Sequence, residues 1–459
     1  MRNGDYFYRR KCNDVLLRTC LIILISHFSL LLPHSTFLGS AAFAQDLKPC
    51  GTSVIHRGKS TPQSVRRLAR PESPRRDYLG EKRGLIILVA FPNQKFADED
   101  PQAVWSAIAN QEGYADNGAR GSVSDYFHDQ SYGQFRLSFD VVGPVETKNP
   151  YAYYGMNKDW GDITGWFDQN VGELVEEACF GVADQVQFSD YDWDGDGQVE
   201  QIFLLYAGHG ENDYWSKDST VIWPHMATLS LDWPGYEEGI TLQGMRIDTY
   251  ACSNEINRSN KPNGMGTICH EFSHCLGLPD LYNTEKGYSV AYSYDLMDQG
   301  CYNGDGWCPV GYSSYERYAC GWLTPEPVED AQTVTSLQPL HQQPDVRIFR
   351  TSPEANDYYL IECRKKESWD SFIPSAGLMA WHIDYDETAW RENTVNNDPK
   401  HLRVQRLSLN MIPTGLQGNH TSQFSPPSSQ LWYDLQGRRL SGKPTQRGIY
   451  IHNGRKNIF

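Results

Sequence analysis

The residues best suited to chemistry lie in one short stretch, residues 269–280, which reads CHEFSHCLGLPD. His270 and His274 are four residues apart, so on a helix their imidazoles lie one turn apart on the same face and can reach one metal ion. Glu271 follows the first histidine, where its carboxylate can hold a water bound to that metal rather than ligate the metal itself. The spacing therefore predicts a zinc site in which Glu271 is the catalytic base.

The residues after the second histidine predict how this helix ends and where a third ligand comes from. Gly277 can adopt the left-handed conformation that ends a helix, and Pro279 prevents the helix from resuming. The turn can bring Asp280 back to the metal, which leaves a fourth position open for water, as in catalytic zinc sites. The alternative is a surface helix with two solvated histidines and a capping glycine.

The elements that must position this stretch are predicted from hydrophobic patterns. We expect buried strands over residues 85–91, 135–142 and 201–207 because each is rich in apolar residues and bounded by turn residues. Apolar residues at helical spacing predict helices over 122–131, 166–182 and 307–322. The alternation of strands and helices predicts an α/β catalytic domain over 81–325 with a mixed, twisted sheet. Strands over 358–362 and 377–384 predict a β-rich continuation over 326–404.

An acidic stretch before the third strand predicts a calcium loop. Carboxylates at every second position, with glycines for a sharp turn, suit a cation that takes six to eight oxygen ligands. The full EF-hand spacing fails because the twelfth position, counted from Asp190, is Gln201. The alternative is an acidic, solvated turn. The expected ligands are Asp190, Asp192, Asp194, Asp196 and Glu200.

The N-terminus predicts export. Basic residues between positions 9 and 18 precede an apolar run over 21–32, and Ala42-Phe43-Ala44 offers a cleavage site between small residues. The run is about twelve residues long, whereas a membrane span needs about twenty. We therefore expect a signal peptide over 1–44, no transmembrane helix in the mature chain, and a secreted or cell-surface protein exported through the periplasm. An uncleaved anchor is the alternative.

The next segment and the cysteines predict a zymogen with disulfides. Residues 45–80 are polar and contain two arginine pairs, as suits a pro-segment exposed to proteases. Its Cys50 could occupy the open zinc position as a thiolate and keep the enzyme latent, or could be an ordinary half-cystine. Cys301 and Cys308 are the local disulfide that we expect. Buried thiols or disulfide partners are the expectation for Cys269 and Cys275.

The composition of the chain argues against one class of ligand, and three further histidines are weaker candidates for functional residues. The 459-residue chain has a formal charge of −16 and no basic block in its body, so we expect no binding to nucleic acid. His209, His225 and His382 could be functional, but the expectation for each is a hydrogen-bonded structural histidine.

The zinc motif with its continuation Leu276-Gly277-Leu278-Pro279-Asp280-Leu281-Tyr282 resembles the immune inhibitor A family of secreted metallopeptidases. Further stretches carry the resemblance, which extends over about residues 80–400: 124–127, 131–133, the acidic stretch, Met297, 321–323 and 377–384. The resemblance implies a zincin fold of metzincin type, one zinc, bound calcium, a pro-segment and endopeptidase activity. It implies that His270, His274 and Asp280 bind zinc, and that Met297 lies in a turn beneath the metal.

The C-terminal end predicts a separate segment. Residues 405–430 are rich in Ser, Pro and Gln and read as a linker. Residues 431–459 read as short strands around turns and resemble a sorting signal of the type IX (Por) secretion route, which would make export machinery a partner. A plain terminal hairpin is the alternative.

These observations predict a secreted zinc-dependent endopeptidase acting on proteins or peptides through a zinc-bound water that Glu271 activates. Two alternatives stay open. One is a calcium-stabilised surface adhesin or inactive pseudoprotease, and the other is a zinc hydrolase of non-protein amides such as cell-wall peptides.

Overall fold

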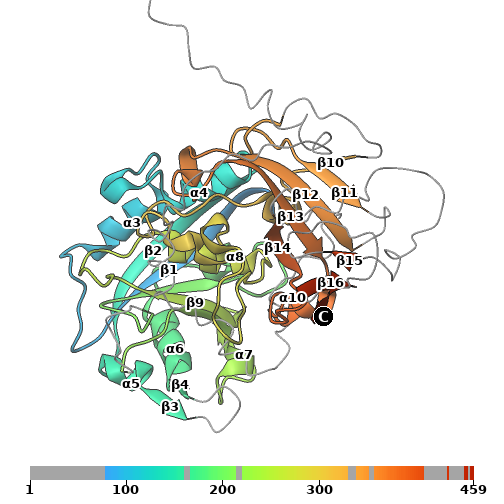
Figure 1. Ribbon diagram of the computed structural model, residues 1–459. Helices are drawn as coiled ribbons and strands as arrows, with labels where there is room; N and C mark the ends of the chain where they lie inside the picture. The colour runs from blue at the N-terminus through green and yellow to red at the C-terminus, as the bar shows by residue number, and fades with distance from the viewer. Residues whose placement is uncertain are drawn as a thin grey trace, which may run out of the picture. The chain divides into compact units, whose positions relative to one another are not determined.

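The computed structural model describes residues 78–159, 166–212, 220–328, 337–350 and 356–407, together with three short strands between 432 and 458 (Figure 1). The chain forms two compact units, Met1–Thr414 and Gly415–Phe459. The expected signal peptide, nearly all of the expected pro-segment with Cys50, and most of the expected linker lie outside the described residues.

A mixed five-stranded sheet forms the centre of the first unit. Its strand order is β2-β1-β5-β9-β6, and only the edge strand β6 runs antiparallel to its neighbour. The expected α/β fold with a mixed sheet is confirmed, although β6 and β9 were not predicted. The strands are β1 Gly80–Ala90, β2 Phe135–Glu146, β5 Ile202–Tyr206, β6 His225–Thr228 and β9 Thr249–Asn254.

Side chains of β1 alternate between two hydrophobic cores, as a strand buried on both faces requires. Leu85 and Ile87 point into a core that includes α6 (Val171–Gly181). Ile86 and Leu88 point into a larger core on the other face. That second core contains α3 (Pro101–Asn110), α4 (Val123–Gln130) and α8 (Gly266–Cys275).

Local sequence explains where two of these helices begin. Ser122 caps α4 and forms a capping box with Asp125, because each side chain accepts a hydrogen bond from the other residue's backbone N–H. Asp100 accepts a hydrogen bond from Ala103 N–H at 3.0 Å, and Pro101 starts α3. The predicted helix over 122–131 is confirmed, whereas α3 was missed.

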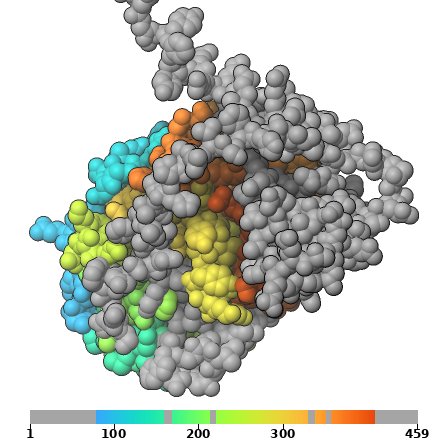
Figure 2. All heavy atoms as spheres, viewed as in Figure 1, coloured from blue at the N-terminus to red at the C-terminus, as the bar shows by residue number. Residues whose placement is uncertain are grey.

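A second sheet has the strand order β10-β11-β12-β13-β14. It packs on the side of α8 that faces away from the main sheet (Figure 1). Phe272 of α8 shares one hydrophobic core with Tyr358 and Trp381 of this sheet. In the space-filling view, yellow residues from the part of the chain around α8 reach the surface between blue-to-green and orange-to-red elements (Figure 2). The elements are α9 Ser314–Ala319, β10 Glu326–Pro327, β11 Arg347–Arg350, β12 Asp357–Arg364, β13 Gly377–Asp384, α10 Glu387–Arg391 and β14 Val404–Leu407.

Two predicted helices are shorter than expected. The helix predicted over 166–182 begins only at Val171, because Trp166–Asp168 forms strand β4, which pairs with β3 (Asn157–Asp159). The helix predicted over 307–322 is reduced to α9, since Pro309 and Gly311 interrupt its first part.

The remaining elements are α5 Tyr151–Gly155, α7 Leu229–Asp232, β7 Ile240–Leu242, β8 Met245–Ile247 and the 3₁₀ turns η3 Asp116–Gly118, η4 Phe188–Tyr191, η5 Tyr292–Tyr294, η6 Gln299–Tyr302 and η7 Ser368–Asp370.

The eight described cysteines are all buried. Cys308 has a free thiol, which lies 3.8 Å from the carbonyl oxygen of Ser368, so the expected Cys301–Cys308 disulfide is wrong. Burial raises the pKa of Cys269 well above its usual value, as expected for a buried thiol that is not a metal ligand. No helix among the described residues is long and apolar enough to cross a membrane.

The second unit contains a small antiparallel sheet of three strands, in the order β15-β16-β17. The strands are β15 Trp432–Tyr433, β16 Ile449–His452 and β17 Arg455–Ile458. Short strands around turns were expected here, and the sorting role of this segment stays a prediction.

Candidate active site

Helix α8 carries the predicted metal site and is buried along its whole length. Its first residue is Gly266, whose N–H donates to the carbonyl oxygen of Gly306 at 2.9 Å. A Cβ atom at Gly266 would lie 1.8 Å from the carbonyl oxygen of Cys301, so only glycine allows the helix to approach this loop so closely. The close approach brings the start of α8 against Cys301 and Gly306, in a segment that follows Asp280 in the chain.

The end of α8 has the geometry that Gly277 predicts. Gly277 has a φ of +82°, and its N–H donates to the carbonyl oxygen of His274 at 2.8 Å. The N–H of Leu278 donates to the carbonyl oxygen of Ser273 at 3.2 Å. These two bonds form a Schellman motif, which turns the chain back toward the helix just before Asp280.

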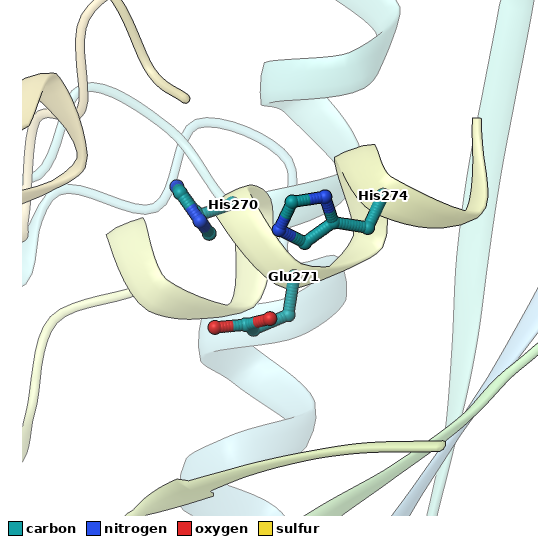
Figure 3. A group of neighbouring side chains, drawn as sticks. All are labelled: His270, Glu271 and His274. Atoms are coloured by element: carbon teal, nitrogen blue, oxygen red, sulfur yellow. The ribbon is translucent and has the colours of Figure 1, made fainter. Parts of the chain in front are cut away.

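Three predicted ligands meet at one point. Asp280 Oδ1 lies 3.1 Å from His270 Nε2 and 3.4 Å from His274 Nε2. Figure 3 shows both imidazoles beside each other on α8, and their ring planes are 86° apart. Ligands about 2.0–2.1 Å from a tetrahedral zinc lie about 3.3–3.4 Å from one another. The spacing of these three atoms therefore fits zinc.

Backbone carbonyls fix the orientation of both histidines. His270 Nδ1 donates to the carbonyl oxygen of Leu296, and His274 Nδ1 donates to that of Leu278, each at 2.8 Å. A carbonyl oxygen only accepts hydrogen bonds, so the proton of each neutral ring lies on Nδ1. Each Nε2 lone pair is then available to a metal, and the partner on Nδ1 holds the ring in place.

A carboxylate that binds a metal must be ionised, and the surroundings of Asp280 favour the ionised form. Burial alone would raise its pKa, but when the rings of His270 and His274 are protonated, the charge of His274 and hydrogen bonds from both rings lower the pKa well below its usual value. Asn393 Nδ2 also donates to Asp280 Oδ2, at 2.6 Å. Sequence reasoning missed Asn393 because it lies 113 residues beyond Asp280 and belongs to no motif.

Glu271 is fully buried beside the two histidines (Figure 3). One ligand atom each from His270, Glu271 and His274 lie within 4.8 Å of one another. At such distances one water can lie between the Glu271 carboxylate and a metal held by the histidines. A pocket opens beside these residues and is lined by Thr267, His270, Glu271, Tyr282, Gly287, Ser289, Asp298, Gln299, Cys301 and Tyr302.

The turn that contains Met297 lies against the ligands. Leu296 supplies the carbonyl oxygen that holds His270, and the Met297 carbonyl oxygen accepts the N–H of Leu281 at 2.7 Å. Met297 itself is fully buried, and its N–H donates to Asp295 Oδ1 at 2.9 Å. The turn therefore supports both the first ligand and the segment that carries the third.

The acidic loop brings together only part of the predicted calcium set. Carboxylate oxygens of Asp192, Asp194 and Glu200 lie within 4.8 Å of one another. Asp190 instead forms an ion pair with Arg83. Asp196 Oδ1 accepts the N–H of Gln198 at 2.9 Å, and neither Asp190 nor Asp196 belongs to this group of three.

The side chains of three other histidines each lie at hydrogen-bond distance from a neighbouring residue. His225 is buried and contacts Tyr250 Oη through Nε2 at 2.8 Å. His209 Nε2 lies 2.9 Å from Asn260 Oδ1, and His382 Nε2 lies 3.0 Å from Asp357 Oδ1. All three agree with the expectation of structural histidines.

Comparison with known families gives a match over the part of the chain that holds the site. The family model described as "Immune inhibitor A peptidase M6, catalytic domain" matches residues 90–320, about half of the chain. This stretch contains the main sheet from the end of β1 onward, α8 and the Met297 turn.

Two curated relatives are similar to about half of the chain. "Pre-pro-metalloprotease PrtV" of Vibrio cholerae serotype O1 is 24% identical over 285 residues, which cover 52% of this chain and 30% of the relative. "Immune inhibitor A" of Bacillus thuringiensis subsp. alesti is 24% identical over 290 residues, which cover 54% of this chain and 41% of the relative. The match thus spans less than half the length of either relative.

Proposed function

The chain belongs to the immune inhibitor A peptidase M6 family, and from this membership and the geometry of the site we infer that it is a secreted zinc-dependent endopeptidase. The observation that carries this proposal is the convergence of His270 Nε2 and His274 Nε2 on Asp280 Oδ1, beside the buried carboxylate of Glu271.

His270, His274 and Asp280 would hold the zinc ion. Two neutral imidazoles and one carboxylate form a donor set that catalytic zinc uses, and three protein ligands leave a position open. Bound zinc supplies a Lewis acid that polarises the scissile carbonyl and lowers the pKa of a water in the open position.

The residues of the chain perform the proton transfers. Glu271 accepts a proton from the attacking water and then donates it to the leaving amine. Its burial keeps bulk water away from the carboxylate, which strengthens its interactions. Leu278 and Leu296 hold the histidine rings through their carbonyl oxygens, so the ligands need little rearrangement during the reaction.

The pocket beside the site has a volume of about 20 Å³, which is enough for about one water molecule next to the Glu271 carboxylate. Tyr282 and Tyr302 supply large aromatic surfaces at its wall, and Glu271 lies at the same pocket. The membership of the peptidase family supports proteins or peptides as substrates.

Calcium and export complete the proposal. We propose that Asp192, Asp194 and Glu200 hold a structural calcium ion, because hard cations prefer grouped carboxylate oxygens. The signal-like N-terminus supports secretion, and a pro-segment with Cys50 as a latency thiol fits that route. The C-terminal unit would act as a sorting segment.

The test compares the secreted mature protein with a Glu271→Ala variant on casein, with zinc measured in both. General acid–base catalysis contributes about 10²–10⁴-fold in rate, so we expect the variant to lose at least about 100-fold in casein hydrolysis. Both proteins should hold about one zinc per chain, because Glu271 is not a ligand. Chelation should abolish the activity of the unmodified protein.

The other outcomes distinguish the alternatives. If neither protein binds zinc, the site assignment fails and the adhesin or pseudoprotease hypothesis leads. If both bind zinc and the mature protein cleaves cell-wall peptides but not casein, the substrate is a non-protein amide. Equal casein cleavage by both proteins would refute the role of Glu271.

A further inference from the structure

The loop that follows α10 reaches the segment carrying the third ligand. Asn393 Oδ1 accepts the backbone N–H of Asp280 at 2.7 Å, and Asn393 Nδ2 donates to Asp280 Oδ2 at 2.6 Å. Both polar atoms of one amide are thus bonded to one residue. Asp280 is fully buried and Asn393 is 8% exposed, so water does not compete effectively for these bonds.

The residue type at position 393 fits both its contact and its backbone. An asparagine side chain offers an acceptor and a donor in one plane, whereas aspartate lacks the donor when ionised. Asn393 has a φ of +53°, in the left-handed region that asparagine tolerates better than most residues with a Cβ. The Thr284 hydroxyl donates to the carbonyl oxygen of Asn393 at 3.0 Å, which further fixes this backbone.

The contact determines which oxygen of Asp280 faces the histidines. Asn393 binds Oδ2, and Oδ1 lies near both His270 Nε2 and His274 Nε2. Rotation of the carboxylate would break the bond to Asn393. A hydrogen-bonded partner that orients a metal ligand in this way typically contributes about 10- to 100-fold to metal affinity.

Other residues attach the same loop to the same segment without touching the ligand. Asn396 Nδ2 donates to the carbonyl oxygen of Leu281 at 2.7 Å. Asn397 Oδ1 accepts the N–H of Thr284 at 2.8 Å. Attachment of the loop and orientation of Asp280 are therefore carried by different side chains, which makes the two effects separable by mutation.

We propose that Asn393 is a positioning residue for the third zinc ligand, Asp280. The metal centre is then completed by a residue outside the stretch 90–320 that the family model matches. The inference rests on the proposed zinc site, and it adds a requirement for the loop between α10 and β14.

The experiment measures zinc affinity of the full chain by competition with a chromogenic chelator. All proteins carry Glu271→Ala, which prevents self-cleavage and separates binding from turnover. Asn393→Gly removes the amide and keeps the left-handed backbone, and Asn397→Gly is the matched control in the same loop. We expect Asn393→Gly to weaken zinc binding about 10- to 100-fold and Asn397→Gly to leave it unchanged.

Two further measurements separate positioning from folding. The visible spectrum of the cobalt-substituted protein should change in Asn393→Gly and not in Asn397→Gly, because only the first alters the geometry of a ligand. In an Asp280→Ala background, Asn393→Gly should have no additional effect on zinc affinity, since it acts through Asp280. If Asn393→Gly does not fold, Asn393→Ser takes its place, because a hydroxyl is too short to reach both groups of Asp280.

Each outcome bears on a stated claim. Equal zinc affinity in Asn393→Gly and the parent overturns the inference and leaves the proposed function intact. An equal loss in Asn393→Gly and Asn397→Gly also overturns it, because the loop would then act only by attachment. If the parent binds no zinc, the proposed function fails and the inference fails with it.

Discussion

Asp295 and Glu316 are two fully buried carboxyl groups, and Asp295 supports the turn that contains Met297. Burial, together with the charge of Asp298, raises the pKa of Asp295 to about 7. Burial and the charge of Asp295 raise the pKa of Glu316 well above its usual value. The two side chains share a hydrogen bond, so they titrate as a pair that retains a proton where exposed carboxyls have lost theirs. This pair lies next to Leu296, whose carbonyl oxygen holds His270.

Asp295→Asn should change how stability depends on pH. The folded pKa of Asp295 is about 7 and its ordinary value is 3.8, so the folded state binds more protons between these limits. The free energy of unfolding of the unmodified protein therefore falls as pH rises from about 4 to 7, by up to about 1.4 kcal/mol per pH unit from this group. An asparagine does not titrate and avoids this loss.

The measurement is urea unfolding of both proteins, freed of metal, at pH 5, 6, 7 and 8. We expect the Asn variant to gain stability relative to the unmodified protein from pH 5 to 7, with the difference constant at higher pH. A difference that stays constant between pH 5 and 7 would show that Asp295 is ionised throughout this range.

At the scale of elements, the acidic loop joins η4 to β5. Some of its residues pack in the hydrophobic cores, and others lie at the surface. Asp192 Oδ2 accepts the N–H of Gly197 at 2.9 Å, and Glu200 Oε2 accepts that of Trp193 at 2.7 Å. Trp193 in turn packs in the larger hydrophobic core. Three carboxylates held close together repel one another, and a cation bound among them would remove that repulsion.

Calcium should therefore raise the melting temperature of the zinc-loaded Glu271→Ala protein. A ligand at a hundred times its dissociation constant stabilises by about 2.7 kcal/mol, and a domain of about 150–250 residues gains about 2–4 °C per kcal/mol, with a larger protein gaining less. We expect an increase of several degrees that Asp192→Asn abolishes. Asp190→Asn is the matched control, because Asp190 pairs with Arg83 and lies outside the group of three. An equal calcium response in Asp192→Asn would disprove this site.

For the first unit as a whole, the second sheet is part of the core rather than an appendage. Leu360 and Trp381 are fully buried in the core that also contains Phe272 of α8. A buried ion pair between Arg364 of β12 and Glu362 lies beside α9, because Glu362 accepts the N–H of Ser314 at 2.6 Å. The sheet β10–β14 thus covers the side of α8 that faces away from the main sheet.

Two truncations test this dependence. A chain ending at Leu407 keeps both sheets, and we expect it to retain zinc binding and casein hydrolysis. A chain ending at Pro325 loses the second sheet and should be unfolded. Each large apolar side chain that loses its burial costs about 1.5–3 kcal/mol, and about five to ten such losses match even the upper end of the roughly 5–15 kcal/mol stability of a typical domain. A soluble, zinc-binding chain ending at Pro325 would contradict this expectation.

The sequence by itself determined what depends on neighbours along the chain. The spacing of His270 and His274 follows from the period of a helix, and the end of α8 follows from the freedom of Gly277 to take a positive φ. Strand β1 and helix α4 were predictable for the same reason, since apolar runs and capping residues act within one element. The start of α3 is encoded equally locally, by Asp100 as the cap and Pro101 as the first helical residue.

Only the tertiary structure decided what depends on residues that are distant in sequence. Asn393 meets Asp280 across 113 residues, and Leu296 meets His270 across 26. No local pattern encodes such contacts, because the backbone carbonyl of Leu296 and the amide of Asn393 are chemical groups that many residues share. The same holds for Asp190, which the acidic pattern grouped with the expected calcium ligands and which the fold pairs with Arg83 instead. The local sequence thus specified the reactive groups, while packing of the two sheets around α8 selected the partners that orient them.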